Sequence, residues 1–307
     1  MSGSKEAPVR VCDAHCDTLF SLLTSPDRSN DVTLERLKAG GVSVQTMAMY
    51  VGAAADIDTI GRRFDGMLQI FERLKEEGWH QLDDPALAKA DDPAVMLSIE
   101  GCEVFARGLG TIEEYRRKGV RMAAVTWNHV NALGTPHCHD ATTGLTAYGL
   151  DAVKEMQRLG IAVDISHLNE AGFYDILNKT HQPPMASHSC ARALCDHTRN
   201  LTDRQLKDLF GAGGFVGINF FPTFLIEKGP CTIDTVIDHI DHMYGLGGEG
   251  KVGFGSDFDG IDSKPEGLDN PADFPALIER LRQRGFGQDA VRDIAGEAFI
   301  QYFSRIG

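Results

Sequence analysis

The feature that most constrains the fold is a repeated alternation of short apolar runs with amphipathic stretches. Eight such runs can be counted: Val9–Ala14, Val42–Val51, Ala94–Ile99, Met122–Thr126, Ile161–Ile165, Pro184–Ala186, Phe215–Asn219 and Val252–Gly255. Nearly continuous apolar runs are typical of strands buried on both faces in parallel sheets. Eight strand–helix repeats predict an α/β fold, a (β/α)8 TIM-like barrel, with an open doubly wound sheet as the alternative.

Helical periodicity separates several of the runs. The stretch Ala147–Leu159 carries apolar residues on one face and is followed by Gly160, which favours a helix end. Two more helices are expected over residues 274–281 and 291–299, the latter with Asp289 as its cap.

Two segments read as long loops, Asn128–Leu145 and Phe220–Gly229, because both contain glycine and proline. Loops of this length in a compact domain often cover or line a binding site.

Composition narrows the class of protein. The 307 residues suit one barrel domain over 1–307, and a net charge of −14 disfavours nucleic acid and anionic membranes as partners. There is no apolar stretch for a signal peptide or membrane span and no lipid-anchor signal. Seven cysteines without a CxxC pair indicate reduced thiols. Together these features predict a cytoplasmic protein.

Chemistry-bearing residues follow the apolar runs, where barrel enzymes place their reactive side chains. Five of the eight runs end this way: the first in His15 and Asp17, the third in Glu100, the fifth in His167, the sixth in His188, and the eighth in Asp257 and Asp259.

Five of these side chains form a candidate metal site. His15 and Asp17 are two residues apart on a strand, so both can point to one cation, and their donor atoms suit zinc. Glu100 abuts a buried strand and can either bridge two metals or form a salt bridge at the rim. With His167 and His188 on adjacent strands, the set predicts two ions about 3.5–4 Å apart, as used in metal-assisted hydrolysis.

Two further residues are candidates for catalysis and substrate binding. Asp257 lies among small residues in Gly253–Gly260 and can act as general base and acid, or alternatively as a metal ligand or turn former. Asp259 precedes a glycine and is interpreted as a turn residue. Arg199 can clamp a carboxylate through two hydrogen bonds, or form a surface ion pair.

Other tempting residues are given structural roles. The loop cluster His137–Asp140 is not interpreted as a third metal site, and His239 and His242 are expected to be structural residues of a helix. Three cysteines near the proposed ligands are expected to pack in the core: Cys16, Cys102 and Cys190.

Several of these segments resemble the membrane (renal) dipeptidase family of two-zinc peptidases. The similar segments are Asp13–Thr18, Ser98–Gly101, Asp164–His167, Ser187–Ser189, Thr198–Asn200, Gly253–Gly260, Pro265–Leu268 and Gly296–Phe299. The resemblance runs in order from about residue 9 to residue 303, and the missing signal and anchor segments make the chain similar to the soluble bacterial branch.

The resemblance implies a ligand set and a reaction. Two Zn²⁺ per chain, replaceable by Mn²⁺ or Co²⁺, would be held by His15 and Asp17, by His167 and His188, and by a bridging Glu100, itself part of the catalytic centre. A metal-bridging water or hydroxide would attack the peptide carbonyl while Asp257 transfers the proton. Arg199 would bind the free carboxylate, so the expected substrates are L-Xaa-L-Xaa and L-Xaa-D-Xaa dipeptides, and the expected assembly is a homodimer.

The chain departs from the family pattern at one position. Mammalian members carry a histidine after the fourth strand that helps stabilise the oxyanion, and Trp127 occupies that place here. Trp127, Asn128 and His129 are therefore candidates for contact with the substrate.

Two other functions remain as alternatives. A related binuclear amidohydrolase would act on a lactone, a cyclic amide or a phosphoester, and Arg199 argues against it. A non-catalytic binding barrel would not need a general base, so the presence of Asp257 argues against it.

Overall fold

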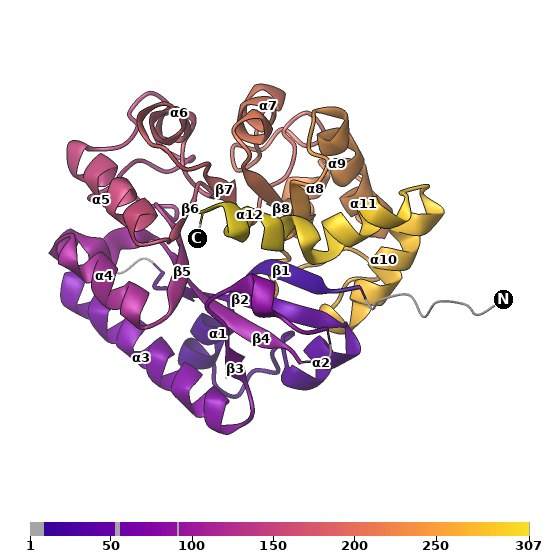
Figure 1. The fold of residues 1–307 in the computed structure, drawn as a ribbon, viewed down its shortest axis with the longest axis horizontal. Helices are drawn as coiled ribbons and strands as arrows, with labels where there is room; N and C mark the ends of the chain where they lie inside the picture. Colours follow the sequence, from indigo (N-terminus) through magenta and orange to yellow (C-terminus); the bar gives the residue numbers. More distant parts are fainter. Residues whose placement is uncertain (1–8, 53–55, 91, 307) are drawn as a thin grey trace.

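Parallel strands close into a barrel in the computed structural model, which describes residues 9–52, 56–90 and 92–306 (Figure 1). The barrel strands are β1 (Val11–Cys16), β2 (Val42–Tyr50), β4 (Ala94–Glu100), β5 (Val120–Ala124), β6 (Ala162–Asp164), β7 (Met185–Ala186), β8 (Phe215–Ile218) and β9 (Val252–Phe254). Each pairs in parallel with the next, β2 pairs with β4, and β9 pairs with β1, while β3 (His80–Gln81) adds to β4. The predicted (β/α)8 barrel is confirmed, and the open sheet is ruled out by the β1–β9 pairing.

Helices surround the barrel (Figure 1). They are α1 (Thr18–Thr24), α2 (Leu34–Ala39), α3 (Ile57–Glu76), α4 (Gly110–Arg117), α5 (Ala147–Arg158), α6 (Glu170–Lys179), α7 (Asp203–Gly211), α8 (Pro222–Leu225), α9 (Ile233–Gly245), α10 (Phe274–Gln283), α11 (Gln288–Arg292) and α12 (Ala298–Ile306). Short turns of other helix types are η1 (Pro85–Leu87), η2 (Cys102–Arg107), η3 (Pro271–Asp273) and η4 (Asp293–Glu297). Within the described ranges, every helix is too short or too polar to cross a bilayer.

Local sequence signals explain several helix ends. The hydroxyl of Thr146 accepts a hydrogen bond from the Gly149 amide and caps α5, which ends just before Gly160 at φ +66°. This helix and α10 lie where periodicity predicts them. The loop expected over Phe220–Gly229 is interrupted by α8, because Pro222 has a backbone angle already suited to a first helical turn.

The helix expected over residues 291–299 is present, but it contains a π-helical turn. It runs without a break through α11, η4 and α12, and the residue at the N-cap of α11 is Gly287 rather than Asp289. A Cβ on Gly296 would lie 2.7 Å from the carbonyl oxygen of Arg10, so this turn packs directly on the chain entering β1. That backbone contact, invisible in the periodicity, coincides with the wider turn.

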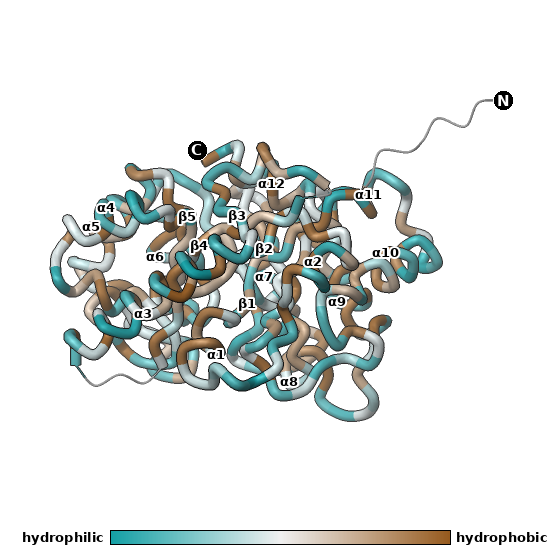
Figure 2. Tube along the Cα trace, turned by 90° about the horizontal axis from the view of Figure 1, so that it is seen from below, coloured by the Kyte–Doolittle hydropathy of each residue, from teal (hydrophilic) through white to brown (hydrophobic). Residues whose placement is uncertain are grey.

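Two apolar clusters fill the molecule. The larger lies between strands and helices, and the smaller lies inside the barrel, where Cys12, Val44, Met96 and Met122 meet Phe299 and other residues of α12. Figure 1 shows α12 crossing one end of the barrel, and Figure 2 shows hydrophobic segments gathered toward the interior of the trace. Because α12 covers that end, polar side chains can gather only at the opposite end, where the C-terminal ends of the strands lie.

Candidate metal centre and substrate cavity

A bulge in β1 aims His15 into the barrel mouth. Cys12 and Ala14 belong to the interior cluster, so strict alternation would turn His15 outward. Between Asp13 and Cys16, however, β1 advances three residues while β2 advances two, from Gln45 to Met47. The extra residue shifts the alternation, as β-bulges near active sites commonly do.

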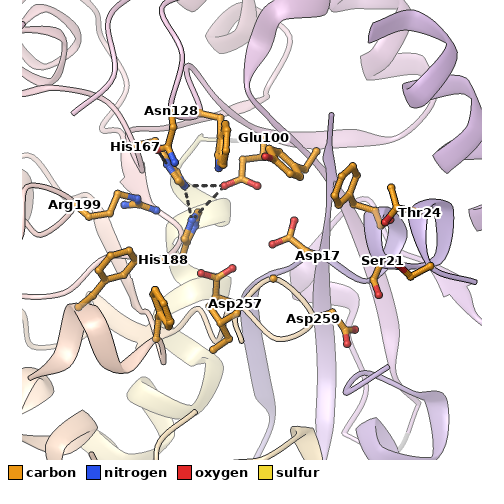
Figure 3. A pocket seen from close by; sticks show the side chains of 18 of the residues that line it. Asp17, Ser21, Thr24, Glu100, Asn128, His167, His188, Arg199, Asp257 and Asp259 are labelled. Atoms are coloured by element: carbon orange, nitrogen blue, oxygen red, sulfur yellow. Dashed lines mark hydrogen bonds and ion pairs between the residues drawn. The ribbon is translucent and has the colours of Figure 1, made fainter. Parts of the chain in front are cut away.

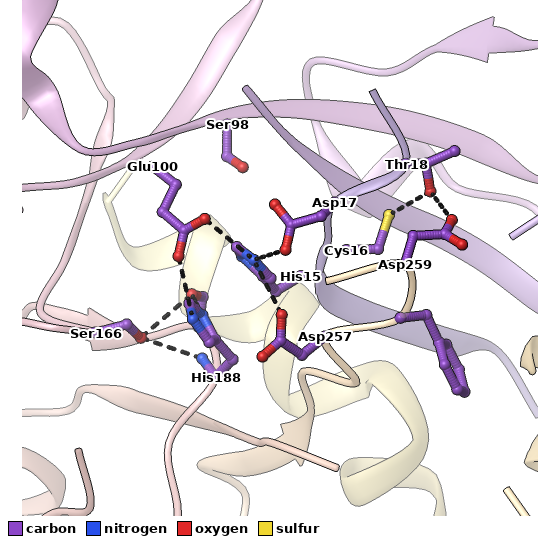
Figure 4. A network of polar contacts seen from close by, with 12 residues as sticks. His15, Cys16, Asp17, Thr18, Ser98, Glu100, Ser166, His188, Asp257 and Asp259 are labelled. Atoms are coloured by element: carbon purple, nitrogen blue, oxygen red, sulfur yellow. Dashed lines mark hydrogen bonds and ion pairs between the residues drawn. The ribbon is translucent and has the colours of Figure 1, made fainter. Parts of the chain in front are cut away.

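His15, Asp17 and Glu100 converge at this mouth (Figure 4). The Nε2 atom of His15 lies 3.5 Å from Oδ2 of Asp17 and 3.7 Å from Oε2 of Glu100. All three side chains are buried, and each offers one ligand atom within 4.8 Å of the others. This is one of three metal-capable groups in the described part of the chain.

A second metal-capable group shares Glu100. Its Oε1 atom lies 2.9 Å from Nε2 of His167 and 3.4 Å from Nε2 of His188, and the two Nε2 atoms are 3.1 Å apart. The ring of His188 also stacks on that of His15, with centroids 3.8 Å apart. The structure thus brings all five predicted ligands together, with Glu100 in the middle.

Hydrogen bonds fix the orientation of both histidines in the second group. Ser187 donates its hydroxyl proton to Asp164 and so accepts from Nδ1 of His188 at 2.7 Å. Nδ1 of His167 lies 2.8 Å from the side-chain oxygen of Asn128. Each ring therefore uses Nδ1 as a donor and presents the lone pair of Nε2 to Glu100, which is the arrangement that metal-binding histidines adopt.

The electrostatics of the cluster also favour cations. Burial, followed by Asp17, raises the pKa of Glu100 well above its usual range. Burial alone would lower the pKa of His15, but Glu100, Asp17 and Asp257 outweigh it and raise the value to about 10. Three carboxylates thus crowd around one imidazole, an arrangement that bound cations would neutralise.

The pKa values of the other two histidines shift in the opposite direction, because no carboxylate outweighs burial there. Burial is the main reason that the pKa values of His167 and His188 lie well below normal, with nearby cationic groups adding to the shift. Both imidazoles are therefore neutral, the form that binds metal.

Two buried ligand atoms without a hydrogen-bond partner show whether the site suits a metal ion. In the described part of the chain, His15 Nε2 and Asp17 Oδ1 are buried and have no hydrogen-bond partner. Such atoms are costly unless something else binds them. Because their neighbours are carboxylates and neutral histidines, the donor set fits divalent cations such as Zn²⁺.

Asp257, on the loop after β9, belongs to the third metal-capable group, with His15 and His188. Its backbone amide bonds to the carbonyl of His15 at 3.1 Å, and its Oδ1 lies 3.7 Å from Nε2 of the same residue. The amide of Asn219 donates to its other oxygen at 2.8 Å. Burial raises the pKa of Asp257 to about 6, against the lowering effect of His15, so this carboxyl can exchange a proton near neutral pH.

Backbone strain is concentrated at the same place. Among described residues other than glycine, only His167, Asp257 and Asp259 have positive φ, between +66° and +67°. Non-glycine residues in this region cost free energy and gather at functional sites. Gly260 leaves room beside them, because a Cβ there would lie 2.0 Å from Oδ2 of Asp17.

A cavity of about 450 Å³ opens over the cluster (Figure 3). Arg199 lines it at one side, although its residue surface is only 4% exposed. One guanidinium nitrogen donates to Ser189 at 3.2 Å, while Nε and Nη2 are buried without a hydrogen-bond partner in the described chain. A buried guanidinium with two free N–H groups is suited to bind an anion; the surface ion pair considered as an alternative is not formed.

The three candidate substrate contacts differ in position. Trp127 and Asn128 line the cavity, whereas His129 is exposed outside that lining, with its ring 5.3 Å from that of Trp127. Asn128 is engaged by His167 and also by Nε2 of His137 at 3.1 Å. Its amide therefore orients histidines rather than pointing freely at a substrate.

Asp259 has the structural role expected of it, with more partners than a turn requires. Its carboxylate accepts from the backbone amides of Asp31 and Val32 and from the hydroxyl of Thr18 at 2.7 Å. It thereby ties the segment before α2 to the start of α1.

The residues set aside also have structural partners. Asp140 bonds to Thr142 and Thr143 in its own turn, and no metal-capable group of the described chain includes the 137–140 cluster. His239 is fully buried, accepts from the Ala191 amide and contacts the Leu225 carbonyl, as a structural histidine would. All seven cysteines are free.

Sequence reasoning assigned no role to Asn219, Ser187 or Asp164. Asn219 ends the seventh apolar run, so the criterion that found the other site residues also applies to it. The contacts of Ser187 and Asp164 join neighbouring strands, and one sequence carries no signal for them. His137 was also missed as a partner of Asn128, because it lies in a loop with no regular spacing.

Comparison with known proteins gives a consistent result. The family model for membrane dipeptidases, peptidase family M19, matches residues 6–306. An uncharacterized protein encoded near pqqA in Klebsiella pneumoniae is 38% identical over 64% of this chain and 75% of its own length. Two uncharacterized dipeptidases of Schizosaccharomyces pombe are 37% and 36% identical, and the matched part covers about half of each.

Solved structures match over nearly the whole chain. Dipeptidase AC, a metallopeptidase of family M19, has a TM-score of 0.88 at 26% identity, covering 97% of this chain and 99% of its own. A metallopeptidase from Rhodobacter sphaeroides, bound to a phosphinate mimic of L-Ala-D-Ala, has a TM-score of 0.87 at 27% identity, covering 98% and 100%.

Proposed function

Since this chain belongs to the membrane dipeptidase family, peptidase family M19, and is a metallo-dipeptidase of that family, we propose that it uses two zinc ions to hydrolyse dipeptides of the L-Xaa-L-Xaa and L-Xaa-D-Xaa types. The observation that carries the proposal is the unpaired guanidinium of Arg199, which lies in the cavity that opens over the five predicted metal ligands, from here on called the metal-capable cluster. A carboxylate anchor beside a hydrolytic centre suits a short peptide with a free C-terminus.

The residues that would hold the ions are the two groups that share Glu100. His15 and Asp17 would hold one, His167 and His188 the other, and Glu100 would bridge them. When bound, two such cations supply an activated water and polarise the scissile carbonyl. Mn²⁺ and Co²⁺ accept the same donor atoms, so they are expected to substitute for zinc.

Asp257 would act first as general base and then as general acid. Its carboxylate faces His15, and with a pKa of about 6 it can take a proton from the attacking water and give it to the leaving amine. Asn219 holds one carboxylate oxygen, which leaves the other directed at the cluster.

Arg199 would bind the C-terminal carboxylate of the substrate. Ser189 supports one nitrogen of the guanidinium, and the two free N–H groups remain for the substrate. Desolvation by burial lowers the pKa of Arg199, while Glu100 and Asp257 counter this, so the group stays charged at neutral pH. This anchor favours a dipeptide over a lactone or cyclic amide, which has no carboxylate at that place.

The test combines metal counting with a substrate panel. The purified protein would be analysed for metal and assayed on L,L- and L,D-dipeptides and on the corresponding C-terminal amides. The proposal expects about two zinc ions per chain, dipeptide hydrolysis, and strong loss of activity on the amides. Two metals without turnover of any dipeptide would refute it and direct attention to cyclic amides and lactones.

The expected homodimer is part of the proposal and has its own measurement. Light scattering coupled to size exclusion gives the mass of the protein in solution. A mass of twice 33.5 kDa is expected, and a monomer at assay concentration would contradict it.

A further inference from the structure

The cavity has two unlike ends on either side of the metal-capable cluster. In Figure 3, Arg199 lies on one side, and Ser21 and Thr24 of α1 lie on the opposite side. If Arg199 holds the C-terminal carboxylate, the second residue of the dipeptide lies at the Arg199 end of the cavity. The first residue then extends toward α1, so the lining there decides which first residues fit.

Three aromatic rings form the wall at the α1 end. The ring of Phe20 contacts that of Tyr50 with centroids 4.7 Å apart, and Tyr50 contacts Trp127 at 4.8 Å. Tyr50 is the register partner of Glu100, so its side chain points to the same face of the sheet as the proposed bridging ligand. The wall therefore runs from α1 to the edge of the metal-capable cluster.

Each of these rings is only partly buried, although it lines a cavity. Aromatic surface left open in a concave site is a common signature of ligand contact, because a ligand with a matching apolar group removes it from water. The cavity of about 450 Å³ leaves room for a dipeptide with a large side chain at this end.

The polar groups at this end do not favour a polar side chain. Ser21 donates its hydroxyl proton to Asn30 and Thr24 donates its own to the Phe20 carbonyl, so neither has a free donor. A basic side chain would meet the like charge of Arg28 at the cavity lining. An apolar side chain meets no like charge.

We propose that Phe20, Tyr50 and Trp127 form the subsite for the amino-terminal residue, and that the preferred substrates are dipeptides whose first residue is aromatic or large and aliphatic. The inference rests on the proposed dipeptidase function and specifies its substrate class.

The test compares kcat/KM for Phe-Ala, Leu-Ala, Ala-Ala, Lys-Ala and Glu-Ala with the zinc-loaded enzyme. Phe-Ala and Leu-Ala are expected to exceed the other three by about tenfold or more, since burying several methylene-sized groups is worth a factor of that order. Phe20→Ala should lower the ratio of kcat/KM for Phe-Ala to kcat/KM for Ala-Ala by about tenfold. Phe20→Leu should retain part of the preference for Phe-Ala. Leu87→Ala, an apolar truncation at a side chain exposed outside the cavity, serves as the control and should leave the ratio unchanged.

The outcomes separate the two proposals. Hydrolysis of dipeptides without preference at the first residue would overturn the subsite while leaving the dipeptidase function intact. So would an equal loss on Phe-Ala and Ala-Ala in both Phe20 variants, because that result indicates a purely structural role. Failure to hydrolyse any dipeptide would overturn both.

Discussion

Asp257 shows how a single side chain acquires a function from its surroundings. Its strained backbone, its bond to Asn219 and its contact with His15 all hold the carboxylate at the edge of the cluster. Burial raises its pKa toward neutrality, where a carboxyl can both take and give a proton. None of these properties belongs to aspartate as such.

Removing only the charge of this residue should separate catalysis from metal binding. Asp257→Asn keeps the shape of the side chain but cannot accept a proton, so kcat should fall by about 10²–10⁴-fold while the zinc content stays near that of the native enzyme. Steady-state kinetics and elemental analysis measure the two effects. Asp262→Asn, at an exposed carboxylate nearby, is the matched control. Loss of one zinc ion together with activity would instead make Asp257 a metal ligand.

Arg199 allows a second prediction at this scale. Arg199→Lys keeps the positive charge but loses the paired N–H groups, so kcat/KM for dipeptides should fall by about tenfold to a hundredfold, mostly through KM. The exposed Arg204→Lys should change neither constant. If Arg199→Lys behaves like the native enzyme, carboxylate binding lies elsewhere in the cavity.

At the scale of elements, the site depends on a close approach between the segments that follow β7 and β9, two strands separated in the sheet by β8. A Cβ on Gly255, at the end of β9, would lie 1.9 Å from the backbone oxygen of Ser187 and 3.2 Å from Cα of His188. The glycine therefore permits a contact between backbones, and that contact positions a proposed ligand.

Gly255→Ala should disturb both stability and the metal site. The added methyl forces the segments after β7 and β9 apart, at a cost of roughly 1–3 kcal/mol or more, and displaces His188, so both the melting temperature and zinc affinity should fall. Calorimetry and a zinc competition titration measure the two. Gly245→Ala, in α9 with nothing within 4 Å of its Cβ, should be neutral or slightly stabilising. Unchanged affinity in Gly255→Ala would show that the strand ends can adjust without moving the ligand.

For the whole molecule, the charge distribution links metal binding to stability. Asp17, Glu100 and Asp257 are buried together at the barrel mouth, with His15 among them and Arg199 in the same cavity. Without cations, their mutual repulsion opposes the folded state; with cations, the same groups stabilise it.

Chelation should therefore lower the melting temperature of the native protein, by about 5 °C or more if metal had been present at a hundred times its dissociation constant. Adding Zn²⁺, Mn²⁺ or Co²⁺ should restore it. In Glu100→Ala, which lacks the shared ligand, neither chelation nor added metal should shift the melting temperature appreciably. Equal shifts in both proteins would place the stabilising ions outside this cluster.

The sequence alone determined the parallel α/β architecture, favoured the barrel, and identified the clustered residues. Near-continuous apolar runs are typical of strands buried on both faces, and eight of them with helices between favour a closed barrel over an open sheet; the β1–β9 pairing decides between the two. Because parallel strands end at one rim, polar residues after those runs were bound to meet, and His15, Asp17, Glu100, His167 and His188 do meet. The metal and catalytic roles of these residues stay predictions.

Only the tertiary structure decided how those residues are aimed and what surrounds them. The bulge in β1 that turns His15 inward, the contact of Gly296 beside the π-helical turn, and the partners Asn219 and Ser187 all arise between segments far apart in the chain. The same holds for Asn128, which binds histidines, and for His129, which lies outside the cavity. Periodicity records which face of an element is buried; it does not record which neighbour a side chain meets there, because that depends on packing between elements.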